Sequence, residues 1–273
     1  EYAVNGDLLD LIIQVGGLPE DLARAIFHQV IDGVEACHAS GIVHRDLKPE
    51  NFLLADGFDV KICDFGFAAL LPSAAAAATE CRQRSNTRVS NTRIHPRMSP
   101  SCQSAAREDG EEGEPELGED EEGENEAFWG MSDPSTMRTR VGTLGYMAPE
   151  VKRGEIKQDH RCDMWSLGVC LFIIITGFPP YLDMAPRRDF SLQCILTQQW
   201  RRFWMAKERH ASFSDEFKEI LPRLLEKDPS KRISFDALRK TKWMMGKMPS
   251  RDELAHKLQE RLHQATTHQA AAS

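Results

Sequence analysis

The stretch HRDLKPEN, residues 44–51, places an acid, a lysine and an amide within one short segment, and DFG follows at residues 64–66. In the first segment these side chains are Asp46, Lys48 and Asn51, and Asp64 supplies a second carboxylate. Phosphoryl transfer needs such a set, because its catalysis consists mainly of positioning the reacting groups and neutralising charge. Few other reactions need the same combination, so the two segments predict phosphoryl transfer.

Three further segments extend this pattern downstream. They are GTLGYMAPE at residues 142–150, DMWSLG at 163–168 and DPSKR at 228–232. HRDLKPEN and DFG resemble the catalytic loop and the magnesium-binding motif of the eukaryotic protein kinases. The three further segments resemble, in order, the end of the activation segment, the start of the helix that anchors the catalytic loop, and the late arginine element of the same family. The resemblance runs from residue 1 to about residue 245, apart from one long insertion.

The resemblance implies a mainly α fold. We expect the C-terminal lobe of a protein kinase, a helical bundle with a small β-hairpin, and a long disordered insertion in the activation segment. The chain begins with Glu1, at the family's hinge, so the upper lobe is absent and we expect a fragment. We predict four segments. Residues 1–71 would form the hinge and the first part of the lobe with the catalytic loop, and residues 72–138 a low-complexity insertion in the activation segment. Residues 139–245 would form the remainder of the lobe, and residues 246–273 a C-terminal tail.

The family's catalytic roles can be carried over residue by residue. By the resemblance, Asp46 accepts the proton of the attacking hydroxyl, Lys48 steadies the transferred phosphate, and Thr143 bridges the two. Asn51 and Asp64 would hold Mg²⁺. The implied activity is transfer of the ATP γ-phosphate to serine or threonine hydroxyls of protein substrates. The alternative is a non-catalytic scaffold or decoy, which the missing upper lobe favours and the intact catalytic residues oppose.

Six positions match those that contact the nucleotide in the family: Glu1, Ala3, Asp7, Glu50, Leu53 and Cys63. Glu1 and Ala3 would offer backbone groups to the adenine, and Asp7 would lie near the ribose. Asp7 could instead simply cap a helix that begins at Leu8. Cys63 would face the pocket, where it could react with electrophiles, although a buried thiol is usually an inert small hydrophobe.

Five further residues match regulatory or structural positions. Thr139 has the spacing of an activating phosphorylation site, and Arg45 would pair with its phosphate. Glu150 and Arg232 would form a buried ion pair, and Asp163 would hydrogen-bond the backbone of the catalytic loop. The NFLL run at residues 51–54 and the GYMAPE ending resemble the calcium/calmodulin-dependent and AMP-activated group of serine/threonine kinases.

The segment from Asp64 to Glu150 is much longer than the family's usual activation segment. Residues 81–107 hold six arginines and no acid, whereas residues 108–126 hold twelve acids and no base. With few apolar residues to offset the cost of ordering, this composition favours disorder. Arginines without interleaved aromatic residues, next to an acidic run, disfavour nucleic acid as a partner. We expect the two halves to attract each other.

The rest of the composition indicates the compartment and the partners of the protein. The longest apolar run, residues 167–178, is short for a membrane crossing and fits a core helix, so no membrane partner is expected. Seven cysteines without a Cys-x-x-Cys pair favour a reducing, cytoplasmic setting, with the nucleus as the alternative. The expected partners are protein substrates and an upstream kinase. Leu254, Leu258 and Leu262 share one face of the tail, which indicates either a helix packed on the lobe or a marginal, solvated one.

Overall fold

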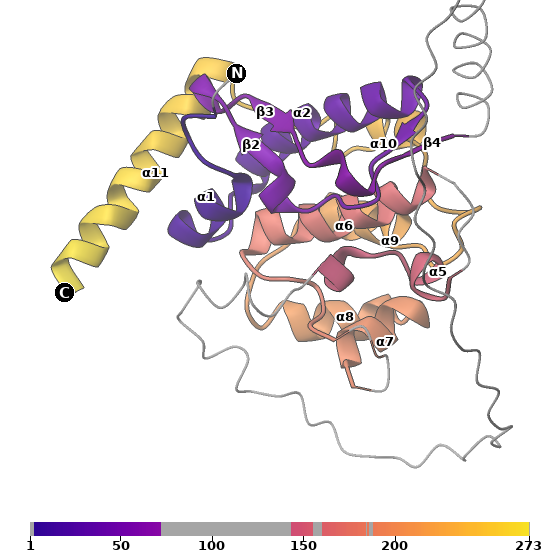
Figure 1. The fold of residues 1–273 in the computed structure, drawn as a ribbon. Helices are drawn as coiled ribbons and strands as arrows, with labels where there is room; N and C mark the ends of the chain where they lie inside the picture. The colour runs from indigo at the N-terminus through magenta and orange to yellow at the C-terminus, as the bar shows by residue number, and fades with distance from the viewer. Residues whose placement is uncertain (1–2, 72–142, 155–159, 184, 186–187, 273) are drawn as a thin grey trace, which may run out of the picture.

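The computed structural model describes residues 3–71, 143–154, 160–183, 185 and 188–272, and most of this part is helical (Figure 1). The α-helices are α1 (Leu8–Val15), α2 (Glu20–Ala39), α5 (Pro149–Lys152), α6 (Arg161–Thr176), α7 (Phe190–Leu196), α8 (Trp200–Lys207), α9 (Asp215–Leu224), α10 (Phe235–Arg239) and α11 (Arg251–Ala272). Short 3₁₀ helices are η1 (Pro49–Asn51), η2 (Asp56–Phe58), η3 (Phe65–Phe67) and η6 (Thr143–Tyr146). The mainly α expectation is confirmed for the described residues. The predicted insertion, Glu1 and Thr139 lie outside them.

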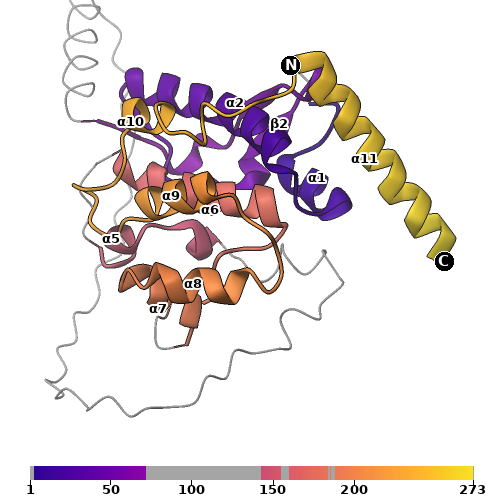
Figure 2. The same ribbon diagram turned by 180° about the vertical axis from the view of Figure 1, so that it is seen from behind.

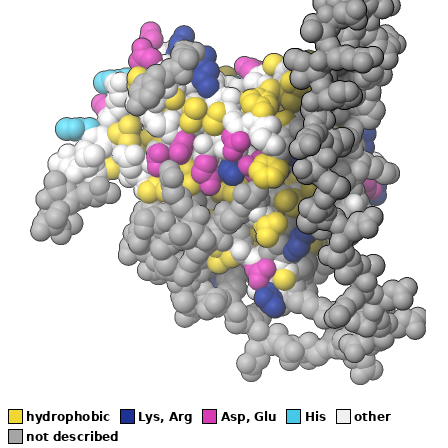
Figure 3. All heavy atoms as spheres, viewed as in Figure 1, with side chains coloured by type: hydrophobic (Ala, Val, Ile, Leu, Met, Phe, Trp, Pro, Cys, Tyr) yellow, Lys and Arg dark blue, Asp and Glu magenta, His cyan; other side chains and the backbone are white. Residues whose placement is uncertain are grey.

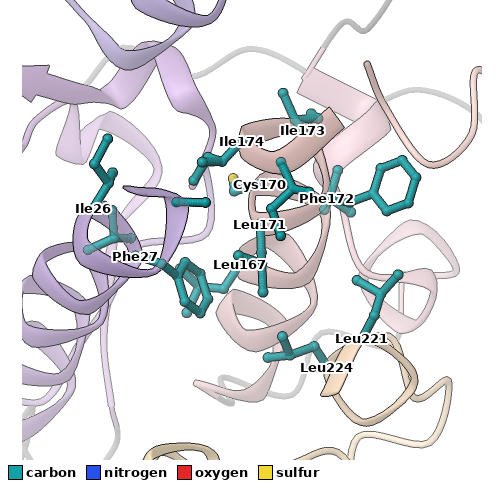
Figure 4. Packing of buried hydrophobic residues seen from close by; sticks show 14 of the residues in the cluster. Ile26, Phe27, Leu167, Cys170, Leu171, Phe172, Ile173, Ile174, Leu221 and Leu224 are labelled. Carbon is teal, nitrogen blue, oxygen red and sulfur yellow. The ribbon is translucent and has the colours of Figure 1, made fainter. Parts of the chain in front are cut away.

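Helix α6 is the centre of the core. Every residue from Asp163 to Ile175 on it is buried, as expected of a helix that is apolar on all sides. Figure 4 shows Ile26 and Phe27 of α2 on one side of α6 and Leu221 and Leu224 of α9 on the other. Helix α6 therefore joins the two sides of the molecule, and it ends at Gly177, whose φ of 78° lies in the left-handed region.

Two short antiparallel strand pairs flank the segment of residues 44–51. Strand β2 (Phe52–Leu54) pairs with β3 (Val60–Ile62), and β1 (Ile42–Val43) pairs with β4 (Ala69–Leu70). The first pair matches the small β-hairpin that the sequence analysis expects, and Asp56 and Gly57 lie in its turn. A Cβ atom at Gly33 of α2 would lie 2.7 Å from the side chain of Ile62, so glycine lets the hairpin pack closely on the helix.

The hairpin and α2 lie at one end of the molecule and α7 and α8 at the other, with α6 between them (Figures 1 and 2). Helix α11 runs along one side, next to α1, and its C-terminal end projects beyond the body. Among the described residues, no helix combines the length and the apolar character that a membrane crossing requires.

Candidate active site

Asp163 organises the backbone of the segment of residues 44–51. Its carboxylate lies in the first turn of α6, is fully buried, and accepts hydrogen bonds from the amides of His44 (2.9 Å) and Arg45 (2.8 Å). A third bond joins it to Nε2 of His38 at 2.7 Å. Arg45 has a φ of 68°, a left-handed conformation that costs free energy for a residue other than glycine. The buried carboxylate offsets this cost by holding the two amides.

Asp46, Lys48 and Asn51 converge within the same segment. Lys48 Nζ lies 2.8 Å from Asp46 Oδ2, and Asn51 Nδ2 donates to the backbone carbonyl of Asp46 at 2.7 Å. The same amide nitrogen is 3.3 Å from Asp46 Oδ2. Asp46 is only 3% exposed, and its Oδ1 is buried with no hydrogen-bond partner in the described part of the chain. One carboxylate oxygen is thus held in place, while the other has no hydrogen-bond partner among the described residues.

Asp64 is attached to this group through backbone contacts. The amide of Cys63 donates to the carbonyl of Asn51 at 3.0 Å, and His44 Nε2 donates to the carbonyl of Cys63 at 2.9 Å. His44 Nδ1 accepts from the amide of Asp46 at 3.3 Å, so the ring is assigned the tautomer with its proton on Nε2. Asp64 itself is exposed and left-handed (φ 58°), and its Oδ1 accepts from the amide of Gly66 at 3.3 Å.

The donor set suits a hard divalent cation. The Nδ2 atom of Asn51 faces Asp46, which leaves its amide oxygen for a ligand, and the exposed carboxylate of Asp64 adds further oxygens. Mg²⁺ prefers oxygen ligands, usually keeps several waters and is commonly held by one or two protein groups together with substrate phosphates. Asn51 and Asp64 match this sparse kind of site. No group of three or more His, Cys, Asp or Glu side chains that could hold a metal occurs among the described residues.

Two of the nucleotide candidates, Asp7 and Leu53, lie next to each other. Asp7 caps α1 by accepting from the amide of Asp10 at 2.8 Å, and it also forms an antiparallel bridge with Leu53 of β2. The capping interpretation of Asp7 is therefore correct, and its role near the ribose stays a prediction. Ala3 and Leu53 are half-buried. Glu1 lies outside the described residues.

Two other nucleotide candidates, Cys63 and Glu50, are involved in pKa shifts. Burial, and then the carboxylates of Asp64 and Asp7, raise the pKa of the Cys63 thiol above its ordinary value. Burial, and then the negative charge of Glu50, raise the pKa of Tyr146 well above its ordinary value. The thiol of Cys63 is thus less ionised than a free cysteine, which favours the inert interpretation.

A buried ion pair ties the activation-segment end to the lobe. Arg232 donates from Nη1 to Glu150 Oε1 at 2.7 Å and from Nη2 to Glu150 Oε2 at 3.0 Å. It also donates to the carbonyls of Arg161 (2.7 Å) and Glu226 (2.9 Å) and lies over the ring of Trp165 at 5.4 Å. The pair that the motifs predict is thus present, with its guanidinium fully engaged.

The structure adds His38, which the sequence analysis did not select. Its ring joins α2 to Asp163 although 125 positions separate the two residues. A histidine in the last turn of a helix gave no signal by itself, because its role depends on a buried partner that is distant in sequence. Of the remaining candidates, Thr139 lies outside the described residues, and only the backbone of Thr143 is described, at the start of η6.

Comparison with known proteins agrees with this geometry. The family model described as "Protein kinase domain" matches residues 1–88 and 129–244. CBL-interacting serine/threonine-protein kinase 16 of Arabidopsis thaliana is 32% identical over 243 residues, which are 89% of this chain and 39% of that protein. CBL-interacting protein kinase 11 of Oryza sativa subsp. japonica is 31% identical over 244 residues, covering 89% of this chain and 35% of the relative.

Carbon catabolite-derepressing protein kinase of Secale cereale is 29% identical over 255 residues, covering 91% of this chain and 36% of the relative. The chain thus spans between a third and two fifths of the length of these curated relatives. Such relatives are consistent with the AMP-activated kinase-like group that the motifs indicated. Because the family model covers most of the sequence, the chain belongs to the protein kinase domain family.

Proposed function

We propose that the complete protein is a serine/threonine protein kinase that transfers the ATP γ-phosphate to hydroxyls of protein substrates. The arrangement around Asp46 carries this proposal: Oδ2 is fixed by Lys48, and Oδ1 is buried and unpartnered among the described residues. A carboxylate held in this way suits a base that accepts the proton of an attacking hydroxyl. A protein that acted only as a scaffold would have no chemical need for it.

The other site residues have complementary roles in this proposal. Lys48 would stabilise charge on the transferred phosphate, since its ammonium group already lies 2.8 Å from Asp46. Asn51 and Asp64 would hold Mg²⁺, which when bound neutralises charge on the ATP phosphates. Ala3 and Asp7 would contact the nucleoside, and Leu53 would lie beneath the adenine ring. Thr143 would bridge Asp46 and Lys48.

Arg45 supports a regulatory phosphorylation at Thr139. The Nη2 atom of Arg45 is buried and finds no hydrogen-bond partner in the described part of the chain. An arginine with an unused donor suits a doubly charged phosphate, which an upstream kinase would add to Thr139. In the complete protein, we expect Thr139→Ala to lower activity to the level that Arg45→Ala gives, because both changes remove the same pair. Full activity of Thr139→Ala would contradict this role.

The nucleotide part of the proposal can be tested with this chain by thermal unfolding in the presence of Mg²⁺-ATP. A ligand at about 100 times its Kd adds about 2.7 kcal/mol of stability, which for a chain of this size corresponds to a rise of roughly 5–10 °C in Tm. We expect that rise in the parent and its loss in Asp64→Ala. The matched control is Asp215→Ala, which removes an acid whose side chain is 95% exposed and distant from the site in sequence.

The catalytic part is tested in the complete protein with Asp46→Asn. We expect phosphate transfer to a protein substrate to fall at least about a hundredfold, while Mg²⁺-ATP binding is retained. Nucleotide binding without any transfer in the unchanged complete protein would favour the scaffold alternative. Absence of a thermal shift in the folded parent chain would restrict the proposal to a protein that has an upper lobe.

A further inference from the structure

Helix α11 lies outside the region that the kinase family model matches, which ends at residue 244. Its start is nevertheless specified locally by a reciprocal pair of side chains. The amide of Ser250 donates to Glu253 Oε2 at 2.8 Å, and the amide of Glu253 donates to Ser250 Oγ at 3.3 Å. This is the capping-box arrangement, which satisfies two otherwise unpaired amides at a helix N-terminus. Helix α11 is therefore a defined element rather than a marginal tail.

One face of α11 belongs to the core. Leu254 is 2% exposed and Leu258 is fully buried, and both belong to the same hydrophobic cluster as Leu8 and Ile12 of α1. Leu262, one turn further along, is half-buried against this cluster. The interpretation of the tail as a helix packed on the lobe is thus correct, and α11 packs on α1, the helix that Asp7 caps.

Two arginines of α11 make polar contacts at the two ends of its packed face. Arg251 forms an ion pair with Asp59, next to the turn of the β2–β3 hairpin. Ten residues later, Arg261 Nη2 donates to the carbonyls of Val15 (3.3 Å) and Gly17 (3.2 Å), at the C-terminal end of α1. One helix therefore spans from the hairpin turn to the far end of α1 (Figure 1).

The two elements that α11 contacts carry different parts of the candidate site. Asp7 is the N-cap of helix α1, and the hairpin connects Asn51 to Asp64. Their near ends are joined by backbone bonds, from the amide of Asn5 to the carbonyl of Leu54 (3.0 Å) and from the amide of Leu54 to the carbonyl of Gly6 (2.8 Å). Leu54 and Asp59 both lie next to the hairpin turn, and α11 runs from this turn to the C-terminal end of α1, so the hairpin, α1 and α11 form a closed set of contacts.

We propose that α11 is a positioning helix that fixes α1 relative to the β2–β3 hairpin, and so sets the spacing between the ribose-side carboxylate and the magnesium ligands. This inference rests on the proposed nucleotide site for its functional consequence, but its structural part does not. Loosening α11 should disturb both elements locally and leave α7 and α9, on the other side of α6, unaffected.

The first experiment measures amide hydrogen exchange by mass spectrometry without nucleotide. Leu258→Ala removes the centre of the apolar contact, and Arg251→Gln with Arg261→Gln removes the polar contacts while leaving the leucines in place. We expect faster exchange in residues 8–17 and 52–62 and unchanged exchange in α7 and α9. Leu258→Met should restore protection, and His256→Ala, at a side chain that is 72% exposed on the same helix, is the control.

The second experiment measures Mg²⁺-ADP affinity of the same variants by calorimetry. We expect the double arginine variant and Leu258→Ala to bind about three- to tenfold more weakly than the parent and His256→Ala. Faster exchange without loss of affinity would show that α11 only stabilises the fold and would overturn the positioning role. Unchanged or uniformly faster exchange would overturn the proposed connection itself. If the parent binds no nucleotide, the proposed nucleotide site fails in this chain, while the exchange experiment still decides whether α11 fixes α1 and the hairpin.

Discussion

At the scale of single residues, Arg232 makes the contacts whose loss should cost most. Its guanidinium is fully buried, and Glu150 is its only partner carboxylate among the described residues. Removing one member of a buried pair typically costs about 3–5 kcal/mol, because the other charge stays buried without compensation. We predict a loss of this size for Arg232→Ala in chemical denaturation. Lys231→Ala, at a neighbouring side chain that is 74% exposed, should change stability little. Equal stabilities of the two variants would show that the pair does not hold the segment.

Cys63 gives a second prediction at this scale, because its raised pKa lowers the fraction of thiolate at neutral pH. The thiolate is the reactive form, so alkylation by iodoacetamide at pH 7 should be slower at Cys63 than at N-acetylcysteine. The rate should rise with pH over a range above that of the free thiol. Peptide mass spectrometry of the folded chain measures both rates. Faster labelling of Cys63 than of the free thiol would restore the hypothesis of a reactive pocket cysteine.

At the scale of elements, Gly246 lets the loop before α11 pass over α2. A Cβ atom there would lie 2.6 Å from Cζ of Arg24, a side chain that donates to the carbonyls of Trp243 and Lys247 and lies 4.7 Å from the Trp243 ring. Gly246→Ala should therefore displace a buried guanidinium and cost about 1–3 kcal/mol. The same change in an Arg24→Ala background should cost much less, since the steric conflict is gone. Additive losses in denaturant unfolding would exclude this mechanism.

The start of α11 gives a prediction about pH. Hydrogen bonds from Ser250 lower the pKa of Glu253 below its ordinary value in the folded chain. A carboxylate with a depressed folded pKa contributes stability above its unfolded pKa, near 4.5, and loses it as the pH falls through the folded value. The Tm difference between the parent and Glu253→Gln should therefore be larger at pH 7 than at pH 3. Glu260→Gln, on the same helix, serves as control, and a difference that does not change with pH would contradict the capping role.

At the scale of the whole molecule, the motifs predicted most of the contacts within a motif segment and between two motif segments. The β2–β3 hairpin, the contacts of Asp163 and the pair of Glu150 with Arg232 could all be expected from them. The bond of His38 to Asp163 could not, because it depends on α2 meeting α6 across 125 positions. The packing of α11 was left open because leucine spacing predicts a face but not its partner. The chemical roles at the site stay predictions, since geometry alone does not test them.

The composition of the charged insertion predicts how much it contributes to the stability of the fold. The kinase family model leaves residues 89–128 unmatched, and this stretch contains all twelve acids of the acidic run but few apolar residues. Such a composition offers little burial to offset ordering, so the segment should contribute little to the core. Shortening a loop also lowers its closure cost, by only about 0.6 kcal/mol for each halving of its length. Replacing residues 89–128 with a short Gly-Ser linker should therefore leave Tm unchanged or slightly raised, measured by calorimetry.

The charge of the insertion provides the control for this deletion. A variant that keeps the length of residues 89–128 but replaces the acids with Gln and Asn separates an effect of charge from one of chain length. If charge attraction to the arginines stabilised the domain, this variant would lose stability and the loss would shrink at high salt, because screening weakens exposed pairs. If the deletion alone lowered Tm by more than about 10 °C, a loss of several kcal/mol for a chain of this size, the removed residues would have to pack on the kinase lobe. The unmatched stretch would then be part of the fold.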